Sequence, residues 1–124
     1  MYTLAVRREF IAQHALIGGD WGAENQPHSH HYMVELQMES DKLNQHGFLV
    51  DIVEVEQALT GLVNGYRDHL LNDKPEFSGL NPSLENFSRI LCVSMDKRVR
   101  AKNIRSIKVI LWENETSWTS YLIE

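Results

Sequence analysis

Three of the chain's six histidines fall within four consecutive positions, in the segment "HSHH" from His28 to His31. If this segment is extended, residues two apart point to the same face, so the imidazoles of His28 and His30 can reach one ion while His31 points away. Zinc is held by three or four nitrogen, sulfur or oxygen ligands at about 2.0–2.3 Å. The spacing therefore indicates part of a metal site, with a polar loop of solvent-facing histidines as the alternative.

A third ligand must come from another part of the chain, and His14 in "FIAQHAL" is the best candidate. It ends the first expected strand. If that strand forms a hairpin with the next one around residues 17–27, His14 lies beside His28 and His30. Three neutral histidines with one open position form a typical catalytic zinc site. Imidazole ligands also suit copper, nickel and iron, so the spacing alone does not select the metal.

The composition bounds the kinds of protein that can hold such a site. With 124 residues, 43% of them apolar, the chain is expected to form one domain over residues 1–124 with a substantial core. Its net charge of −5 argues against nucleic-acid binding, which favours basic domains. The single cysteine excludes an internal disulfide. No apolar run reaches membrane-spanning length, so we expect a cytoplasmic protein without a membrane partner.

Four segments have the alternation of half-buried strands. Tyr2–Phe10 and Tyr32–Glu39 alternate between apolar and polar side chains near the start of the chain. Residues 107–111 and Ser117–Ile123 show the same pattern near its end, separated by the turn-forming sequence "ENET". The two pairs of strands predict two hairpins.

Two segments between these hairpins have helical periodicity. Asp51 can cap the first helix, whose apolar stripe comprises Ile52, Val55, Leu59, Leu62 and Tyr66. The second helix follows a cap at Asn81 or Ser83, and its inward residues are Leu84, Phe87, Ile90 and Leu91. The order ββααββ predicts an α+β fold, in which a four-stranded antiparallel sheet carries both helices on one face.

Several short motifs occur in order along the chain. "FIAQH" resembles F-x-A-x-H, "HSHHY" resembles H-G-H-N-Y with Ser29 for the glycine, and "GFLVDI" resembles G-M-V-x-D-F. "NPSLENF" resembles N-P-T-x-E-N, and "LWENETSWTSY" resembles a closing segment that carries a glutamate. These are motifs of the 6-pyruvoyl- and 6-carboxytetrahydropterin synthase family, which the chain resembles over nearly its whole length.

The resemblance implies the tunnelling fold, or T-fold, in which sheets from several subunits close into a barrel, usually as a homohexamer of two trimers. It implies Zn²⁺ on His14, His28 and His30, a small-molecule pterin substrate and active sites at subunit interfaces. It also implies that Glu113 anchors the pterin, since one carboxylate can accept the adjacent N–H and amino groups of the ring in a bidentate pair. Without the resemblance, Glu113 is interpreted as a charged hairpin residue.

The chain departs from the family pattern at the position of its catalytic cysteine, four residues before the first histidine of the metal-binding pair. Glu24 stands there. It is either a replacement general base, since a partly desolvated carboxylate beside zinc can serve at neutral pH, or an ordinary loop carboxylate. The only cysteine, Cys92, falls within the second expected helix and is interpreted as a small core residue.

A second departure lies in "GYRDHLLND", where one residue separates the pair Asp68 and His69 from the pair Leu71 and Asn72. The family pattern has two residues at this point. Either Asp68 and His69 still form a catalytic relay, or the relay is altered. The structural alternative is that this segment is a helix C-terminus, where a histidine interacts favourably with the helix dipole.

Three functions are consistent with these residues. The first is a zinc-dependent lyase acting on the side chain of 7,8-dihydroneopterin triphosphate, giving 6-carboxytetrahydropterin for queuosine-type deazapurines or a 6-pyruvoyl product. The second, associated with family members that carry glutamate in place of the cysteine, is cleavage to 6-hydroxymethyldihydropterin for folate synthesis. The third is a non-catalytic homologue that binds metal and pterin. The basic segment "KRVRAKNIR" can steer a triphosphate, although a solvated helix end is the preferred interpretation.

Overall fold

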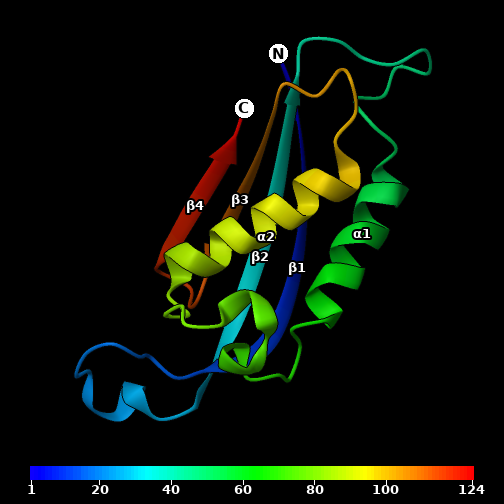
Figure 1. Cartoon of the computed structure of the whole chain (residues 1–124). Coiled ribbons are helices and arrows are strands. Elements are labelled where there is room, and N and C mark those ends of the chain that lie inside the picture. Colours follow the sequence, from blue (N-terminus) through cyan, green and yellow to red (C-terminus); the bar gives the residue numbers. More distant parts are fainter.

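The computed structural model describes all residues from 1 to 124. Four strands form one antiparallel sheet in the order β1-β2-β3-β4, and two helices come between the second and third strands in the chain (Figure 1). The predicted ββααββ order and α+β class are confirmed. The elements are β1 (Tyr2–His14), β2 (His28–Ser40), α1 (Ile52–Asn64), α2 (Leu84–Val99), β3 (Ser106–Trp112) and β4 (Trp118–Ile123).

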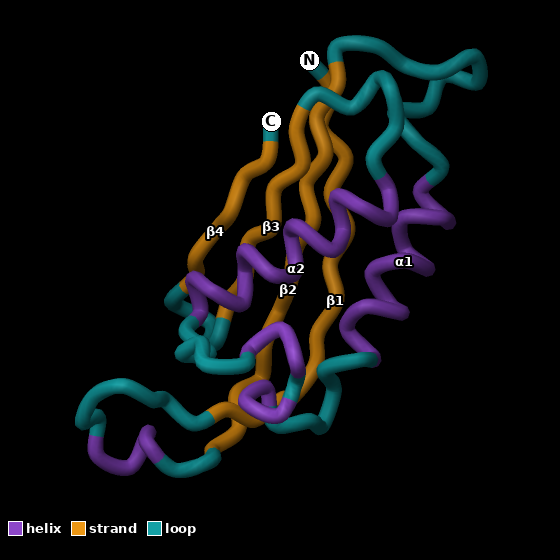
Figure 2. Tube along the Cα trace, in the orientation of Figure 1, coloured by secondary structure: helices purple, strands orange, loops and turns teal.

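Both helices lie on one face of the sheet, as predicted (Figure 2). α2 packs across β3 and β4, and α1 packs against β1 and α2. The strands expose alternate residues to the helices, so one face of the sheet is buried and contributes most of the core. Neither helix has the length and hydropathy that spanning a membrane requires.

The pairing of β1 with β2 decides where the histidines lie. The register runs from Tyr2 opposite Ser40 to His14 opposite His28, so both strands are longer than the alternation predicted. β1 continues past Phe10, and β2 begins at His28 rather than at Tyr32, because the polar ends of the two strands complete each other's backbone hydrogen bonds. The candidate metal ligands therefore belong to the sheet itself.

Side-chain caps begin both helices. The carboxylate of Asp51 accepts a hydrogen bond from the backbone N–H of Val53 at 2.9 Å, as predicted. α2 is capped by the hydroxyl of Ser83, which accepts from the N–H of Asn86 at 3.1 Å. A cap of this kind stabilises a helix by about 1 kcal/mol. Of the two residues predicted for the second cap, Ser83 is the one used, and Asn81 contacts another segment.

The predicted apolar stripes are correct except at two positions. Ile52, the first residue of α1, is 43% exposed. It lies in a surface hollow beside Tyr2 and Phe48, which are themselves exposed, so it stays partly open to solvent. In α2, Ile90 is only half-buried because it lines a groove between the helices. The remaining stripe residues are buried: Val55, Leu59, Leu62, Tyr66, Leu84, Phe87 and Leu91.

An aromatic cluster links the core to the histidines. Phe87 of α2 makes edge-on contacts with four rings, those of Phe10, Tyr32, Tyr66 and Phe77. Phe10 and Tyr32 stack across β1 and β2 with ring centroids 5.4 Å apart, and the Tyr32 ring also contacts that of His14. Each such ring pair contributes about 0.5–1.5 kcal/mol beyond the area that it buries. The candidate metal ligands therefore rest on a closely packed part of the core.

Candidate metal centre

Three histidines meet at the end of the sheet where β1 and β2 are joined. His14 is the last residue of β1, and His28 and His30 begin β2. One ring nitrogen from each lies within 4.8 Å of the others, and the ring centroids are 4.6–5.0 Å apart. His14 is buried and the other two are half-buried. The structure therefore brings together the three residues that the sequence singled out.

His31 points to the opposite face of the sheet, as the period-two pattern requires. Its ring is exposed, and its Nε2 lies 3.8 Å from a carboxylate oxygen of Glu9. Together with Arg7 and Trp112 it lines a separate cavity on the face without helices. His31 is therefore adjacent to the cluster in sequence but lies outside it.

Two backbone carbonyls set the tautomers of His14 and His28. The Nδ1 of His14 lies 2.9 Å from the carbonyl oxygen of Pro82, and the Nδ1 of His28 lies 2.8 Å from that of Gln26. A carbonyl oxygen only accepts hydrogen bonds, so each Nδ1 carries the proton and donates it. When both rings are neutral, as metal ligands must be, each is left with an unprotonated Nε2, and these two Nε2 atoms face each other at 3.0 Å.

This close approach of two Nε2 atoms fits a bound cation. Two unprotonated ring nitrogens cannot hydrogen-bond to each other, and their lone pairs repel. An ion between His14 and His28 replaces that repulsion with two coordinate bonds. Zinc in tetrahedral geometry, with nitrogen ligands at about 2.0–2.1 Å, would hold them roughly 3.3 Å apart, which is close to the observed 3.0 Å. A ring nitrogen of His30 lies within 4.8 Å of the other two, so His30 would supply a third ligand and leave one position of a tetrahedral metal open.

Burial keeps His14 in the neutral form that metal coordination requires. Desolvation lowers the pKa of His14 from 6.5 to about 4, the hydrogen bond to Pro82 opposes this, and the charges of His30 and His28 lower the pKa further. At neutral pH the His14 ring is therefore uncharged, so no proton has to leave it when a metal binds.

Two asparagines hold the chain where it leaves β1. The side chain of Asn72 accepts from the N–H of Ala15 at 2.9 Å and donates to the carbonyl of the same residue at 2.8 Å. The side chain of Asn81 accepts from the N–H of Ile17 at 2.9 Å. Sequence reasoning missed these contacts and the carbonyl of Pro82. The sequence feature that could have revealed them is the asparagine in each of the segments "LND" and "NPS". Neither segment has helical or strand periodicity, so its polar residue needs another explanation.

Glu24 lies between β1 and β2 in a short 3-10 helix, η1 (Gly22–Asn25). Its backbone carbonyl accepts from the N–H of Leu16 at 2.9 Å, which ties the helix to the segment that follows β1. Its side chain is exposed, and its negative charge raises the pKa of His14, although less than burial lowers it. The carboxylate is therefore near enough to the histidines to interact with them electrostatically.

Glu113 follows β3 at the same end of the sheet, and it is half-buried. Burial raises the pKa of Tyr32, and the negative charge of Glu113 raises it further. The hydroxyl of Tyr32 in turn lies 3.3 Å from Nδ1 of His14. Glu113 also lines the cavity beside His31, which has a volume of about 590 Å³. A carboxylate, a buried tyrosine and the candidate metal ligands therefore share one end of the molecule.

Asp68 and His69 lie against the outer edge of β1 rather than in the histidine cluster. The N–H of Asp68 donates to the carbonyl of Ile11 at 2.7 Å, and the N–H of Gln13 donates to the carbonyl of His69 at 2.9 Å. Both side chains are exposed. The Nδ1 of His69 donates to the carbonyl of Arg67 at 2.8 Å, not to Asp68. Within one chain the two residues form no relay, and their catalytic role stays a prediction.

Cys92 is buried in α2, and we expect it to be unreactive. Its Sγ donates to the carbonyl of Ile107 at 3.6 Å, and burial raises the pKa of the thiol to about 11. Because the thiolate is the reactive form, a maleimide at slightly alkaline pH should leave the native chain unmodified and label it quickly in guanidinium chloride. Mass spectrometry measures the label, and rapid modification of the native chain would contradict a core position for this thiol.

Comparisons with known proteins agree on one family. The family model for 6-pyruvoyl tetrahydropterin synthase matches residues 3–124, whereas a search of curated proteins found no match. The 6-pyruvoyl tetrahydropterin synthase of Caenorhabditis elegans superimposes with a TM-score of 0.79 at 16% identity, covering 97% of this chain and 94% of that chain. That of Plasmodium vivax has a TM-score of 0.81 at 12% identity, covering 98% and 97%. A P. vivax variant in which a catalytic glutamate is replaced by alanine has a TM-score of 0.82 at 12% identity, with the same coverage.

These superpositions confirm the predicted tunnelling fold, with its four-stranded antiparallel sheet and two helices. The family model extends through both helices and all four strands. It therefore includes every segment that carries a motif of the family. The chain belongs to the 6-pyruvoyl tetrahydropterin synthase family.

Proposed function

We propose that this chain is a zinc-dependent lyase that acts on the side chain of 7,8-dihydroneopterin triphosphate. His14, His28 and His30 hold Zn²⁺, Glu24 is the general base, and Glu113 anchors the pterin ring. The observation that carries the proposal is the pair of unprotonated Nε2 atoms of His14 and His28, which face each other at 3.0 Å. Membership of the family supports the substrate class.

The residues around the metal candidates prepare the site for proton abstraction. When bound, Zn²⁺ supplies Lewis acidity, which polarises the hydroxyls of the substrate side chain and acidifies the adjoining C–H bonds. The carbonyls of Pro82 and Gln26 orient the rings of His14 and His28 and keep their Nε2 atoms free of protons. Such carbonyl partners also raise the basicity of metal-binding imidazoles. The protein therefore presents ligands that are already in the required tautomer.

We assign to Glu24 the role of taking the proton that such a C–H bond releases. Its backbone is tied to Leu16 at 2.9 Å, so η1 cannot swing away without breaking this bond. A carboxylate that loses water on substrate binding becomes a stronger base, because desolvation raises its pKa. In the P. vivax protein a glutamate is described as a catalytic residue, which supports a carboxylate base on this fold.

Asp68 and His69 fit a role in the site of a neighbouring subunit. Their backbones bond to the outer edge of β1 at Ile11 and Gln13, and their side chains are exposed there, where a second chain can reach them. Asp68 has a φ of +60°, which is uncommon outside glycine and is held here by its bond to Ile11. A homohexamer of two trimers would bring such an edge against a second chain, so this assembly is part of the proposal.

Cleavage of the side chain to 6-hydroxymethyldihydropterin is the second candidate, and Glu24 favours it. A carboxylate in place of a thiol changes the group that moves protons while leaving the metal candidates and Glu113 unchanged. The substrate class is then the same, and the bond that breaks is different.

Product analysis tests both candidates. Zinc-loaded protein is incubated separately with 7,8-dihydroneopterin and with its triphosphate, and the products are identified by mass spectrometry. A 6-carboxy or 6-pyruvoyl product from the triphosphate supports the lyase, and a 6-hydroxymethyl product from either substrate supports the second candidate. Pterin binding without turnover would overturn both and leave a binding protein.

Replacing Glu113 with glutamine should weaken pterin binding by about 10–100-fold, because a hydrogen bond to a charged group is worth about 1.5–3 kcal/mol. The amide can accept only one of the two donors of the ring and presents its own N–H groups to the other. Calorimetric titration with 7,8-dihydroneopterin measures the effect. Glu115→Gln is the matched control, since Glu115 lines the same cavity. Equal affinity in both variants would remove Glu113 as the anchor.

A further inference from the structure

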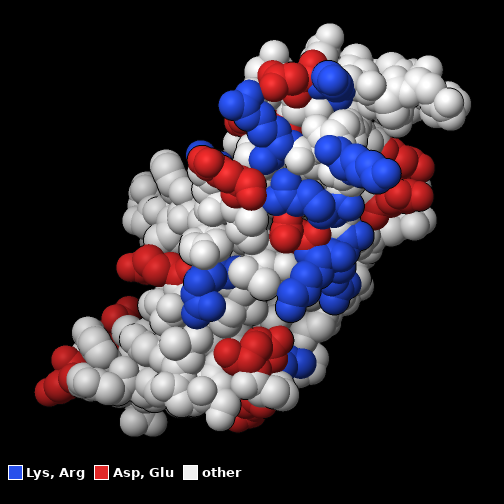
Figure 3. All heavy atoms as spheres, turned by 45° about the horizontal axis from the view of Figure 1, so that its top comes forward, with Lys and Arg blue, Asp and Glu red and all other residues white.

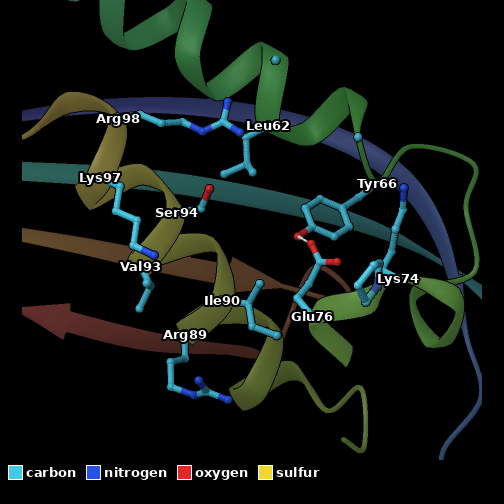
Figure 4. A pocket seen from close by; sticks show the side chains of 13 residues that line it. Leu62, Tyr66, Lys74, Glu76, Arg89, Ile90, Val93, Ser94, Lys97 and Arg98 are labelled. Atoms are coloured by element: carbon cyan, nitrogen blue, oxygen red, sulfur yellow. Dashed lines mark hydrogen bonds between the residues drawn. The ribbon is translucent and has the colours of Figure 1, made fainter. Parts of the chain in front are cut away.

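A groove between α1 and α2 forms a second feature of the molecule, built from none of the residues discussed as metal ligands (Figure 4). It has a volume of about 570 Å³. Glu76 is the only acidic residue that lines it. Four basic side chains line the groove as well, those of Lys74, Arg89, Lys97 and Arg98. In a chain with a net charge of −5, this groove locally reverses the sign of the charge.

The four cations of the groove have no acidic partner. None takes part in any of the chain's ion pairs or donates a side-chain hydrogen bond within the chain. By contrast, Arg100 and Arg105 from the same basic segment are paired with Asp96 at 2.8 Å and Asp41 at 2.9 Å. Figure 3 shows Lys and Arg side chains gathering across the side of the molecule that carries the helices. The segment predicted as a solvated helix end therefore divides into paired and unpaired charges.

The acidic group of the groove is held in a structural contact. Tyr66 is 4% exposed, and its hydroxyl donates to the carboxylate of Glu76 at 2.6 Å, as Figure 4 shows. The Nζ of Lys74 lies 6.0 Å from the centroid of the same ring. Two apolar residues of α2, Ile90 and Val93, also line the groove. The groove thus combines free cations with an apolar wall.

The spacing along α2 selects an extended anion. Arg89, Val93 and Lys97 follow one another at intervals of four residues, so they share one face of the helix. At 1.5 Å per residue, Arg89 and Lys97 are roughly 12 Å apart along the axis. A chain of phosphates can meet both side chains along this length, whereas a single phosphate meets both only if the two side chains bend toward one point. Guanidinium and ammonium groups are the side chains that bind phosphate oxygens most strongly.

We propose that this groove binds a triphosphate, either inorganic or carried by a nucleoside, at a site separate from the metal centre. The cations contact the phosphate oxygens, and Ile90 and Val93 offer an apolar surface to a nucleoside base. The inference rests on the unpaired charges of the groove and does not depend on the proposed lyase activity.

Calorimetric titration of the full chain with inorganic triphosphate, at low salt and without divalent metal, tests this site. The variant Arg89→Gln/Lys97→Gln should bind at least tenfold more weakly than the unaltered chain. Neither side chain has a bonding partner in the structure, so circular dichroism should show an intact fold. ATP is titrated in parallel, and tighter binding of ATP than of inorganic triphosphate would place a nucleoside on the apolar wall.

Two matched variants locate the binding. Lys42→Gln/Lys102→Gln removes the same charge from exposed positions outside the groove, and it should change the affinity less than twofold. His28→Ala should bind triphosphate as well as the unaltered chain. The proposal is overturned if triphosphate does not bind, if both double variants lose affinity equally, if His28→Ala abolishes binding, or if orthophosphate binds as tightly as triphosphate.

Discussion

Replacing His28 with alanine is expected to reduce the zinc content of the purified chain from about one ion per chain to a small fraction of that value. The change removes one of the two unprotonated Nε2 atoms that face each other at 3.0 Å. Loss of a ligand should weaken zinc binding by more than the roughly 10–100-fold that loss of an outer hydrogen-bond partner costs. Inductively coupled plasma mass spectrometry after dialysis into zinc-free buffer measures the difference.

His31→Ala is the matched control for this experiment. It removes the same side chain a few positions away, but from an exposed position on the other face of the sheet. Zinc content should therefore stay at the level of the unaltered chain. Full zinc content in His28→Ala would mean that the three-histidine assignment is wrong. Equal loss in both variants would point to a general effect on folding, which circular dichroism would detect.

Replacing Glu24 with glutamine is expected to lower kcat by about 10²–10⁴-fold, the usual contribution of a general base. Glutamine has nearly the same size, but its amide cannot accept a proton at neutral pH. Zinc content and pterin affinity should change little, because neither His14, His28 and His30 nor Glu113 is altered. Product analysis identifies the substrate, and steady-state kinetics with that substrate measures kcat. Metal analysis measures zinc content, and calorimetry measures pterin affinity.

Asp20→Asn is the control for the charge of the loop. Asp20 lies in the same connection between β1 and β2, and its carboxylate accepts from the N–H of Gly22 at 3.1 Å. Asparagine keeps that acceptor and removes the negative charge, so the rate should change little. An unchanged rate in Glu24→Gln would remove Glu24 as the base. A similar loss in both variants would assign the effect to loop charge rather than to proton transfer.

The grouping of the histidines could be predicted because side-chain direction in a strand is a local property. Alternation alone requires that His28 and His30 share a face and that His31 does not. The hairpin hypothesis adds His14, and the observed register places it directly opposite His28. The resemblance to a family supplied the expectation of zinc and pterin, which no spacing of histidines contains.

The ends of elements were predicted less well than their centres. The alternation of β2 began at Tyr32, whereas the strand already begins at His28 because β1 supplies partners for its polar end. Ile52 was expected to face inward, yet it is 43% exposed. In both cases the outcome depends on what a distant segment does, such as whether a partner strand extends or whether a neighbouring loop covers the side chain.

The sequence by itself determined the ββααββ order, the face of the sheet that is buried and the three histidines that share it. These follow from periodicity and spacing between near neighbours in the chain. Only the tertiary structure decided the tautomer of His14, through the carbonyl of Pro82, and the gathering of unpaired cations between α1 and α2. Hydrogen bonds and charge interactions act over a few ångströms between segments distant in sequence, so no local pattern of residues specifies them.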